Sequence, residues 1–227
     1  MSATPFDRRC SRQVGRWRVV NIRKRLLRVC DADDLSDIVP DKKALSRILC
    51  KMKDRRQIWE TTVQIADFAG DAGKVWSLYK MYAPAHDRAL TKVMKALGWP
   101  EEEKPSHIAS VGEGDEKVRP DAVTLFPKPR LWEMDMDTER QEEIEKKVKA
   151  LKTQPSAVLW VCPTEARRQK LIAWTKDIHD RSFFALWQDL IDDPRGDVWV
   201  NNAGKRRAMS FVPNDVPTEV KSHVPKA

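Results

Sequence analysis

Four acidic residues in the second half of the chain have a spacing that suggests metal chemistry. Asp121 follows Pro120, and Glu133, Asp135 and Asp137 occupy every second position of a later segment. Residues two apart on a strand point to the same face. The last three carboxylates are therefore expected on one face, and pairing with the segment that begins at Asp121 would bring all four together.

Clustered carboxylate oxygens are the ligands that Mg²⁺ and Mn²⁺ prefer, and such ions promote phosphodiester cleavage by stabilising charge and activating water. We therefore predict Asp121, Glu133 and Asp135 as metal ligands and catalytic residues, with Mg²⁺ as the cofactor. An ordinary half-exposed edge strand shows the same alternation of acidic and apolar residues, so the alternative without a metal stays open.

Strands and helices alternate around these acidic residues, which predicts a mixed α/β sheet with helices on its faces over residues 108–212. The polar stretch 213–227 contains three prolines and is expected to be disordered. The expected strands and helices of this region are Val123–Phe126, Arg130–Met136, Thr138–Leu151, Ala157–Val161, Thr164 to about Ile178, Val198–Val200 and Arg207–Phe211.

The other half of the chain carries the positive charge. Residues 1–60 contain sixteen Lys or Arg and eight Asp or Glu, which equals the net charge of +8 of the whole chain. The remaining residues balance, with 26 basic and 26 acidic side chains. A neutral body with a basic N-terminal part is typical of a protein that binds a polyanion, because each phosphate contact releases counterions.

The basic part has the pattern of three short helices and a hairpin. Val19–Val29 has one apolar and one basic face, and Asp31–Val39 ends at Pro40. Asp41 is a predicted N-cap for a third helix, whose apolar residues recur at helical spacing. Ile58–Ile65 and Val75–Tyr79 then predict a β-hairpin with a loop over residues 67–74.

This order of elements is typical of a winged helix-turn-helix, in which the third helix enters the major groove and the hairpin contacts the backbone. We assign it to residues 1–98, followed by a linker over 99–107. Ser46 and Arg47 are best placed for base edges, and the other basic residues are expected to hold phosphates. The predicted DNA-binding residues are Lys42, Lys43, Ser46, Arg47, Lys51, Lys53, Arg55, Arg56 and Lys74.

Several other classes of protein do not fit the sequence. No phosphate-binding GxxxxGK[ST] loop, GxGxxG motif or GxSxG elbow occurs, and the four histidines are isolated. The four cysteines are too far apart for a zinc knuckle. Apolar runs are too short to cross a bilayer, and no export leader is recognisable, so we expect a cytoplasmic protein.

These segments resemble the replication-relaxation family of plasmids and mobile elements over roughly residues 15–200. The resemblance rests on the winged helix and on three short motifs: Arg119-Pro120-Asp121-Ala122, Trp132 to Glu139, and Cys162 to Arg168. The family is associated with replication and relaxation of plasmid DNA. Its second domain is similar to the restriction-endonuclease-like core, which implies an α+β fold with two domains.

In that nuclease core, a Pro-Asp pair precedes a strand with an (Asp/Glu)-x-Lys motif, so the resemblance implies Asp121 and Glu133 as metal ligands. The lysine position is Asp135 in this chain. Because that lysine helps to activate water, its absence argues against cleavage unless Lys146 or Lys147, on the following helix, supplies the charge.

Three functional hypotheses follow. The first is a sequence-specific double-stranded DNA-binding protein that recognises an origin region in plasmid replication or conjugative transfer, with replication or relaxosome proteins as partners. The second is a Mg²⁺-dependent nickase or endonuclease. The third is a transcriptional repressor whose second half forms a homodimer.

Overall fold

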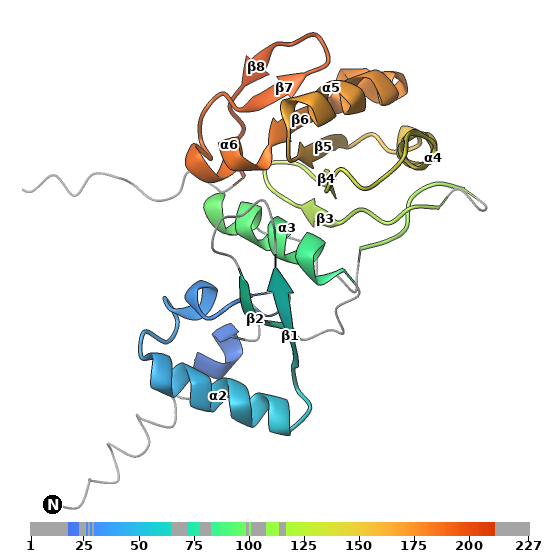
Figure 1. The fold of residues 1–227 in the computed structure, drawn as a ribbon. Coiled ribbons are helices and arrows are strands. Elements are labelled where there is room, and N and C mark those ends of the chain that lie inside the picture. The colour runs from blue at the N-terminus through green and yellow to red at the C-terminus, as the bar shows by residue number, and fades with distance from the viewer. Residues whose placement is uncertain are drawn as a thin grey trace, which may run out of the picture. The chain divides into compact units, whose positions relative to one another are not determined.

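Helices and strands of the computed structural model form a mixed α+β fold that divides into two units (Figure 1). The first unit contains residues 1–95 with 104–106 and 134–136, and the second contains the rest. The structure describes residues 18–22, 26, 28, 30–64, 72–77, 83–98, 100, 108–113 and 117–211. The predicted tail, the predicted linker apart from Pro100, and residues 67–71 of the predicted hairpin loop lie outside these ranges.

The first unit contains elements where the sequence predicted helices and a hairpin, but Leu26 and Arg28 are not helical, although the helix predicted over Val19–Val29 includes them. Residues 18–22 are helical, and the apolar residues Ile22, Leu26 and Leu35 are fully buried. The segment before Pro40 forms a 3₁₀ turn. The described elements of this unit are η1 (Asp33–Leu35), α2 (Lys42–Asp54), β1 (Trp59–Gln64), β2 (Ala72–Ser77) and α3 (Pro84–Ala96).

Buried charges join the start of this unit to α3. The guanidinium of Arg88 donates to the carboxylates of Asp31 and Asp34, and the ammonium of Lys95 lies 2.9 Å from Asp34. Arg88 and Asp34 are each 2% exposed. Because a buried charge is tolerated only when it is paired, this network fixes α3 against the turn that precedes α2.

Strand β2 begins three residues earlier than the sequence predicted, at Ala72 instead of Val75. Strands β1 and β2 pair antiparallel from Trp59↔Ser77 to Gln64↔Ala72. Lys74 therefore lies inside β2, opposite Thr62, and the prediction that it belongs to the loop is wrong. The sequence pattern missed this extension because Ala72 and Gly73 have low strand propensity.

The second unit is built on a six-stranded mixed sheet with the strand order β3-β4-β5-β6-β7-β8. Strands β3 and β4 are antiparallel, whereas β5 and β6 are parallel. The strands are β3 (Ala122–Thr124), β4 (Arg130–Met134), β5 (Ala157–Cys162), β6 (Ser182–Leu186), β7 (Trp199–Asn201) and β8 (Arg206–Arg207). The helices are α4 (Gln141–Lys152), α5 (Glu165–Trp174), the 3₁₀ segment η4 (Lys176–Arg181) and α6 (Trp187–Asp192).

Helices α4 and α5 cover one face of this sheet. Ile144 and Val148 of α4 and Leu171 of α5 belong to one buried cluster with Val158 and Trp160 of β5. The other face carries aromatic residues from distant parts of the chain, which pack against one another with ring centroids 5.2–5.9 Å apart: Trp132, Trp199 and Phe211.

Strand β4 differs from its predicted form in two ways. It lies between β3 and β5 and its last four residues are buried, so the interpretation as a half-exposed edge strand is wrong. It also ends at Met134 rather than Met136, because the chain leaves the sheet before Asp137, whose φ is 59°. Helix α4 accordingly begins after an Arg140 N-cap and not at the predicted Thr138.

None of the helices in the described ranges is long and apolar enough to span a membrane.

Candidate functional site

Helix α2 presents a buried apolar face and an exposed basic face. The Asp41 side chain caps the helix by accepting hydrogen bonds from the backbone N–H groups of Lys43 and Ala44, which confirms the predicted start. Leu45 and Leu49 are buried on one face. All the predicted DNA-binding residues of the helix are exposed on the remainder: Lys42, Lys43, Ser46, Arg47, Lys51 and Lys53.

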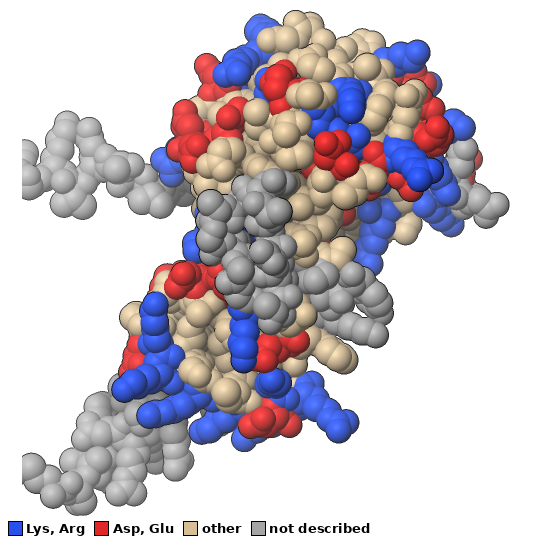
Figure 2. Space-filling model, in the orientation of Figure 1, with Lys and Arg blue, Asp and Glu red and all other residues tan. Residues whose placement is uncertain are grey.

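Most of these cations make no ion pair with a residue that the structure describes. Among the residues that the structure describes, no ion pair involves Lys42, Lys43, Arg47 or Lys51. Basic side chains gather along α2 and at both of its ends (Figure 2). Arg55 and Arg56, which follow the helix, are exposed too. The result is a surface of uncompensated positive charge on a single helix.

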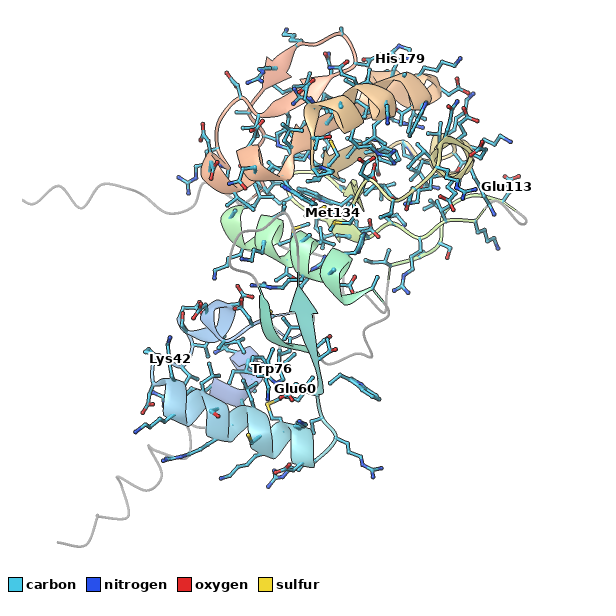
Figure 3. All side chains as sticks on the ribbon, in the orientation of Figure 1. Lys42, Glu60, Trp76, Glu113, Met134 and His179 are labelled. Carbon is cyan, nitrogen blue, oxygen red and sulfur yellow. The ribbon has the colours of Figure 1, made fainter. Side chains whose placement is uncertain are left out.

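Two of the predicted phosphate-binding lysines differ from this group, because Lys53 and Lys74 lie beside the carboxylate of Glu60 on strand β1. This carboxylate lies 2.8 Å from the ammonium of Lys53 and 3.6 Å from that of Lys74. The other oxygen accepts a hydrogen bond from the indole N–H of Trp76 at 3.0 Å (Figure 3). The hydrogen bond from Lys53 holds the pKa of Glu60 below its ordinary value, so this carboxylate stays charged beside the lysines.

A second cluster of charges is buried in the other unit, under helix α4. The side chain of Glu133, on strand β4, is 1% exposed. Lys147 of α4 donates to Glu133 at 2.8 Å and to Glu139 at 2.7 Å. Lys147 is the residue that the sequence suggested as a substitute for the missing motif lysine, and its ammonium is in contact with the motif glutamate. Lys146, the other candidate, is exposed.

Electrostatics couple Asp121 to this pair. Burial, and after it the negative charge of Asp121, raise the pKa of Glu133 to about 8. Burial opposes a charge on Lys147, but the carboxylates of Glu133, Asp121 and Glu139 together raise its pKa above the ordinary value. Lys147 is therefore a permanent cation, while Glu133 takes up a proton within the neutral range.

The four predicted carboxylates do not share one strand face. Asp121 and Glu133 lie within electrostatic reach of each other. Asp135 follows the end of β4, is buried, and is grouped with the first unit. Asp137 is ion-paired with Arg167 at 3.2 Å. Within the described residues, no group of three His, Cys, Asp or Glu side chains is arranged to hold a metal ion.

Two carboxylate oxygens of this cluster are nevertheless available to coordinate a metal ion or to accept a hydrogen bond from water. Oε1 of Glu133 and Oε2 of Glu139 are buried and have no hydrogen-bond partner in the described part of the chain. Buried oxygens without partners are rare and call for an ion or a water. Mg²⁺ commonly uses only one or two carboxylates and completes its shell with water and phosphate oxygens. The sequence pattern did not identify Glu139, because this residue lies between β4 and α4, where the chain has neither strand nor helical periodicity.

Comparison of the chain with known proteins identifies no protein to which it is similar. The chain matches no family model, no curated protein and no solved structure. The resemblance to the replication-relaxation family therefore stays a prediction.

Proposed function

We propose that this chain is a sequence-specific DNA-binding protein that binds the duplex through helix α2. The observation that carries the proposal is the exposed basic face of α2, whose cations lack acidic partners among the described residues. In the winged helix-turn-helix interpretation, α2 is the recognition helix and the β1–β2 hairpin is the wing. Recognition of a plasmid or mobile-element origin is the biological role that the family resemblance implies.

The arrangement on α2 divides the contacts into two kinds. Arg47 and Ser46 lie in the middle of the exposed face, and we assign them to base edges, where an arginine reads guanine with two hydrogen bonds. Lys42, Lys43 and Lys51 lie nearer to the ends of the helix, and we assign them to phosphates.

The test is a selection of bound duplexes from a random pool with the full chain, followed by titration of the selected and a scrambled duplex. Arg47→Ala is expected to weaken binding to the selected duplex by about 1–3 kcal/mol and binding to the scrambled duplex much less. The control is Arg195→Ala, which removes an exposed arginine of the second unit. Equal losses on both duplexes would refute the base-reading role of Arg47. Mapping the selected sequence to an origin or to the protein's own promoter separates the replication role from the repressor role.

Metal-dependent cleavage of DNA is a second candidate, favoured by the contact between Lys147 and Glu133. A bound Mg²⁺ would supply charge stabilisation at the scissile phosphate and activation of water. Glu133 and Glu139 would each supply one carboxylate oxygen to the ion, with the charge of Asp121 within electrostatic reach. Lys147 would orient the two glutamates and keep a positive charge beside them. The incomplete carboxylate set makes this function second to DNA binding.

Supercoiled plasmid incubated with the full chain and Mg²⁺ or Mn²⁺ tests cleavage. Nicking by the wild type that is lost in Asp121→Ala and kept in Asp180→Ala, an exposed acidic control, would establish the nickase. Absence of nicking with both ions, in a preparation that binds DNA, would eliminate it.

A further inference from the structure

Two arginines of the second unit belong to the aromatic side of its sheet. Arg207 is paired across the sheet with Trp199, whose ring lies 5.9 Å from that of Phe211, and Arg130 lies against Phe211. Arg130 begins strand β4, and Arg207 ends strand β8. The guanidinium carbon of Arg207 lies 3.7 Å from the ring centroid of Phe183, and that of Arg130 lies 4.7 Å from the ring centroid of Phe211. Each cation therefore rests on a ring face, which fixes the plane of its guanidinium group.

The rings are themselves held in place. Phe211 packs against Trp132 and Trp199 at 5.2 Å and 5.9 Å, and both tryptophans are fully buried. Arg130 also donates one hydrogen bond, at 2.8 Å, to the backbone carbonyl of Ser210. Both guanidinium groups thus have defined positions without a carboxylate to hold them.

The pair is electrostatically unfavourable as it stands. Burial and then the charge of Arg207 lower the pKa of Arg130, so the two cations are close enough to repel each other. No ion pair of either arginine occurs among the described residues, whereas the neighbouring Arg206 lies within electrostatic reach of Glu165. Two like charges held together without a counterion would be relieved by an anion that accepts hydrogen bonds from both.

We infer that Arg130 and Arg207 form a phosphate-binding site, and that its occupant is a backbone phosphate of DNA. A guanidinium group presents its N–H donors in a planar fork that matches phosphate oxygens. Because each guanidinium group lies with its face over an aromatic ring, the N–H donors at its edge stay available to a ligand. Backbone phosphate is favoured over a free phosphate because Arg207 belongs to the last strand of the sheet, where it and the nearby Lys205 are exposed. The inference rests on the proposed DNA binding and assigns the second unit a DNA contact of its own.

The test compares Arg130→Gln and Arg207→Gln with Lys205→Gln in the full chain, using a fluorescent duplex titrated at several salt concentrations. Lys205→Gln is the matched control, since it removes one positive charge from the same hairpin but does not remove a contact with an aromatic ring such as that of Arg207 with Phe183. Each arginine variant is expected to bind roughly tenfold more weakly. The slope of log affinity against log salt should decrease by about one in each. Melting temperatures are expected to fall slightly in the arginine variants, because each loses a ring contact that Lys205→Gln does not, and binding is therefore measured well below them.

The outcomes separate this inference from the proposed function. Losses in the arginine variants that do not exceed the loss in Lys205→Gln would overturn the inference, even if Arg47→Ala weakens binding as expected. Stabilisation of the wild type, but not of Arg207→Gln, by inorganic phosphate, together with unchanged DNA affinity of the variant, would assign the site to a free phosphate and overturn the backbone assignment. A wild-type chain that binds no DNA would overturn the proposed function and the backbone assignment together.

Discussion

Lysine side chains have opposite environments in the two units. On α2, Lys42, Lys43 and Lys51 are exposed and have no ion pair with a described residue. Under α4, Lys147 is enclosed by two carboxylates at hydrogen-bond distance and by the charge of Asp121. An exposed lysine contributes little to stability and is available to a ligand, whereas a buried paired lysine is required by its partners. We therefore expect substitutions of the exposed lysines to affect binding and substitution of Lys147 to affect folding.

The largest test of this comparison is removal of the buried cation. Lys147→Met removes the group that donates to Glu133 and Glu139 and leaves the buried Glu133 side chain without a partner, and we expect the free energy of unfolding to fall by about 1–3 kcal/mol. Urea denaturation followed by circular dichroism measures this loss. The adjacent exposed residue supplies the control, since Lys146→Met is expected to change stability by less than about 0.5 kcal/mol. Equal effects of the two substitutions would show that the pairing of Lys147 with the two glutamates does not stabilise the fold.

The second test uses the pH dependence of stability. The pKa of Glu133 is about 8 in the folded chain, against an ordinary value of 4.5. The folded state therefore binds the proton more tightly. The stability from this group is complete below about pH 4.5 and is lost as the pH rises through about 8. Glu133→Gln should gain stability relative to the wild type over this range, by up to a few kcal/mol at its upper end.

Denaturation of both proteins at a series of pH values measures this difference. Glu145→Gln, which removes an exposed carboxyl group of α4, should follow the wild type throughout. A constant difference between wild type and Glu133→Gln from acid to neutral pH would contradict the assigned burial of a titrating carboxyl group.

The third test concerns the helix that carries the exposed lysines. Asp41→Ala removes the acceptor for two backbone N–H groups at the start of α2, and we expect a loss of about 1 kcal/mol in stability. Thermal denaturation measures the change. Asp54→Ala, at the other end of the helix, removes an acidic group near the negative end of the helix dipole and should not destabilise the protein. A loss for Asp54→Ala as large as that for Asp41→Ala would show that capping does not determine the stability of α2.

The smallest effect is expected for Lys53 and Lys74, which are exposed like the remaining lysines of α2 but ion-paired like Lys147. Glu60→Gln removes the carboxylate beside Lys53 and Lys74. Both cations then become available to phosphates, so affinity for non-specific duplex DNA should rise a few-fold and its salt dependence should steepen. Fluorescence anisotropy at two salt concentrations measures both quantities. Glu113→Gln makes the same change of charge at an exposed site of the other unit, and an equal gain there would indicate a general effect of net charge.

Local patterns in the sequence predicted the presence of elements better than their bounds: the strand expected over Arg207–Phe211 ends at Arg207, and the helix expected to reach about Ile178 ends at Trp174. The period of Leu45, Leu49 and Met52 and the position of Asp41 gave the bounds and the buried face of α2, because helix amphipathicity and capping depend on residues within one or two turns. The alternation on β4 correctly predicted a strand. It did not predict where the strand ends, which depends on the backbone conformation at Asp137.

Contacts across the fold were harder to predict. The meeting of Lys147 with Glu133 was proposed from the resemblance, but the role of Glu139 was not. The pairing of Arg130 with Arg207 joins residues 77 positions apart in the chain. Strand order and side-chain packing determine such contacts, and neither is encoded in a local period. Glu60 was overlooked for the same reason, since its partners come from α2 and β2.

The short outer strands of the six-stranded sheet have a consequence for the behaviour of the protein at high concentration. Strand β8 is two residues long and both are arginines, and β3, at the other end of the strand order, is three residues long. Unpaired backbone groups on a long outer strand invite another chain to add to the sheet, and short or charged outer strands prevent this. Replacement of both arginines by β-branched apolar residues is therefore expected to promote association of the protein through the outer strands of its sheet.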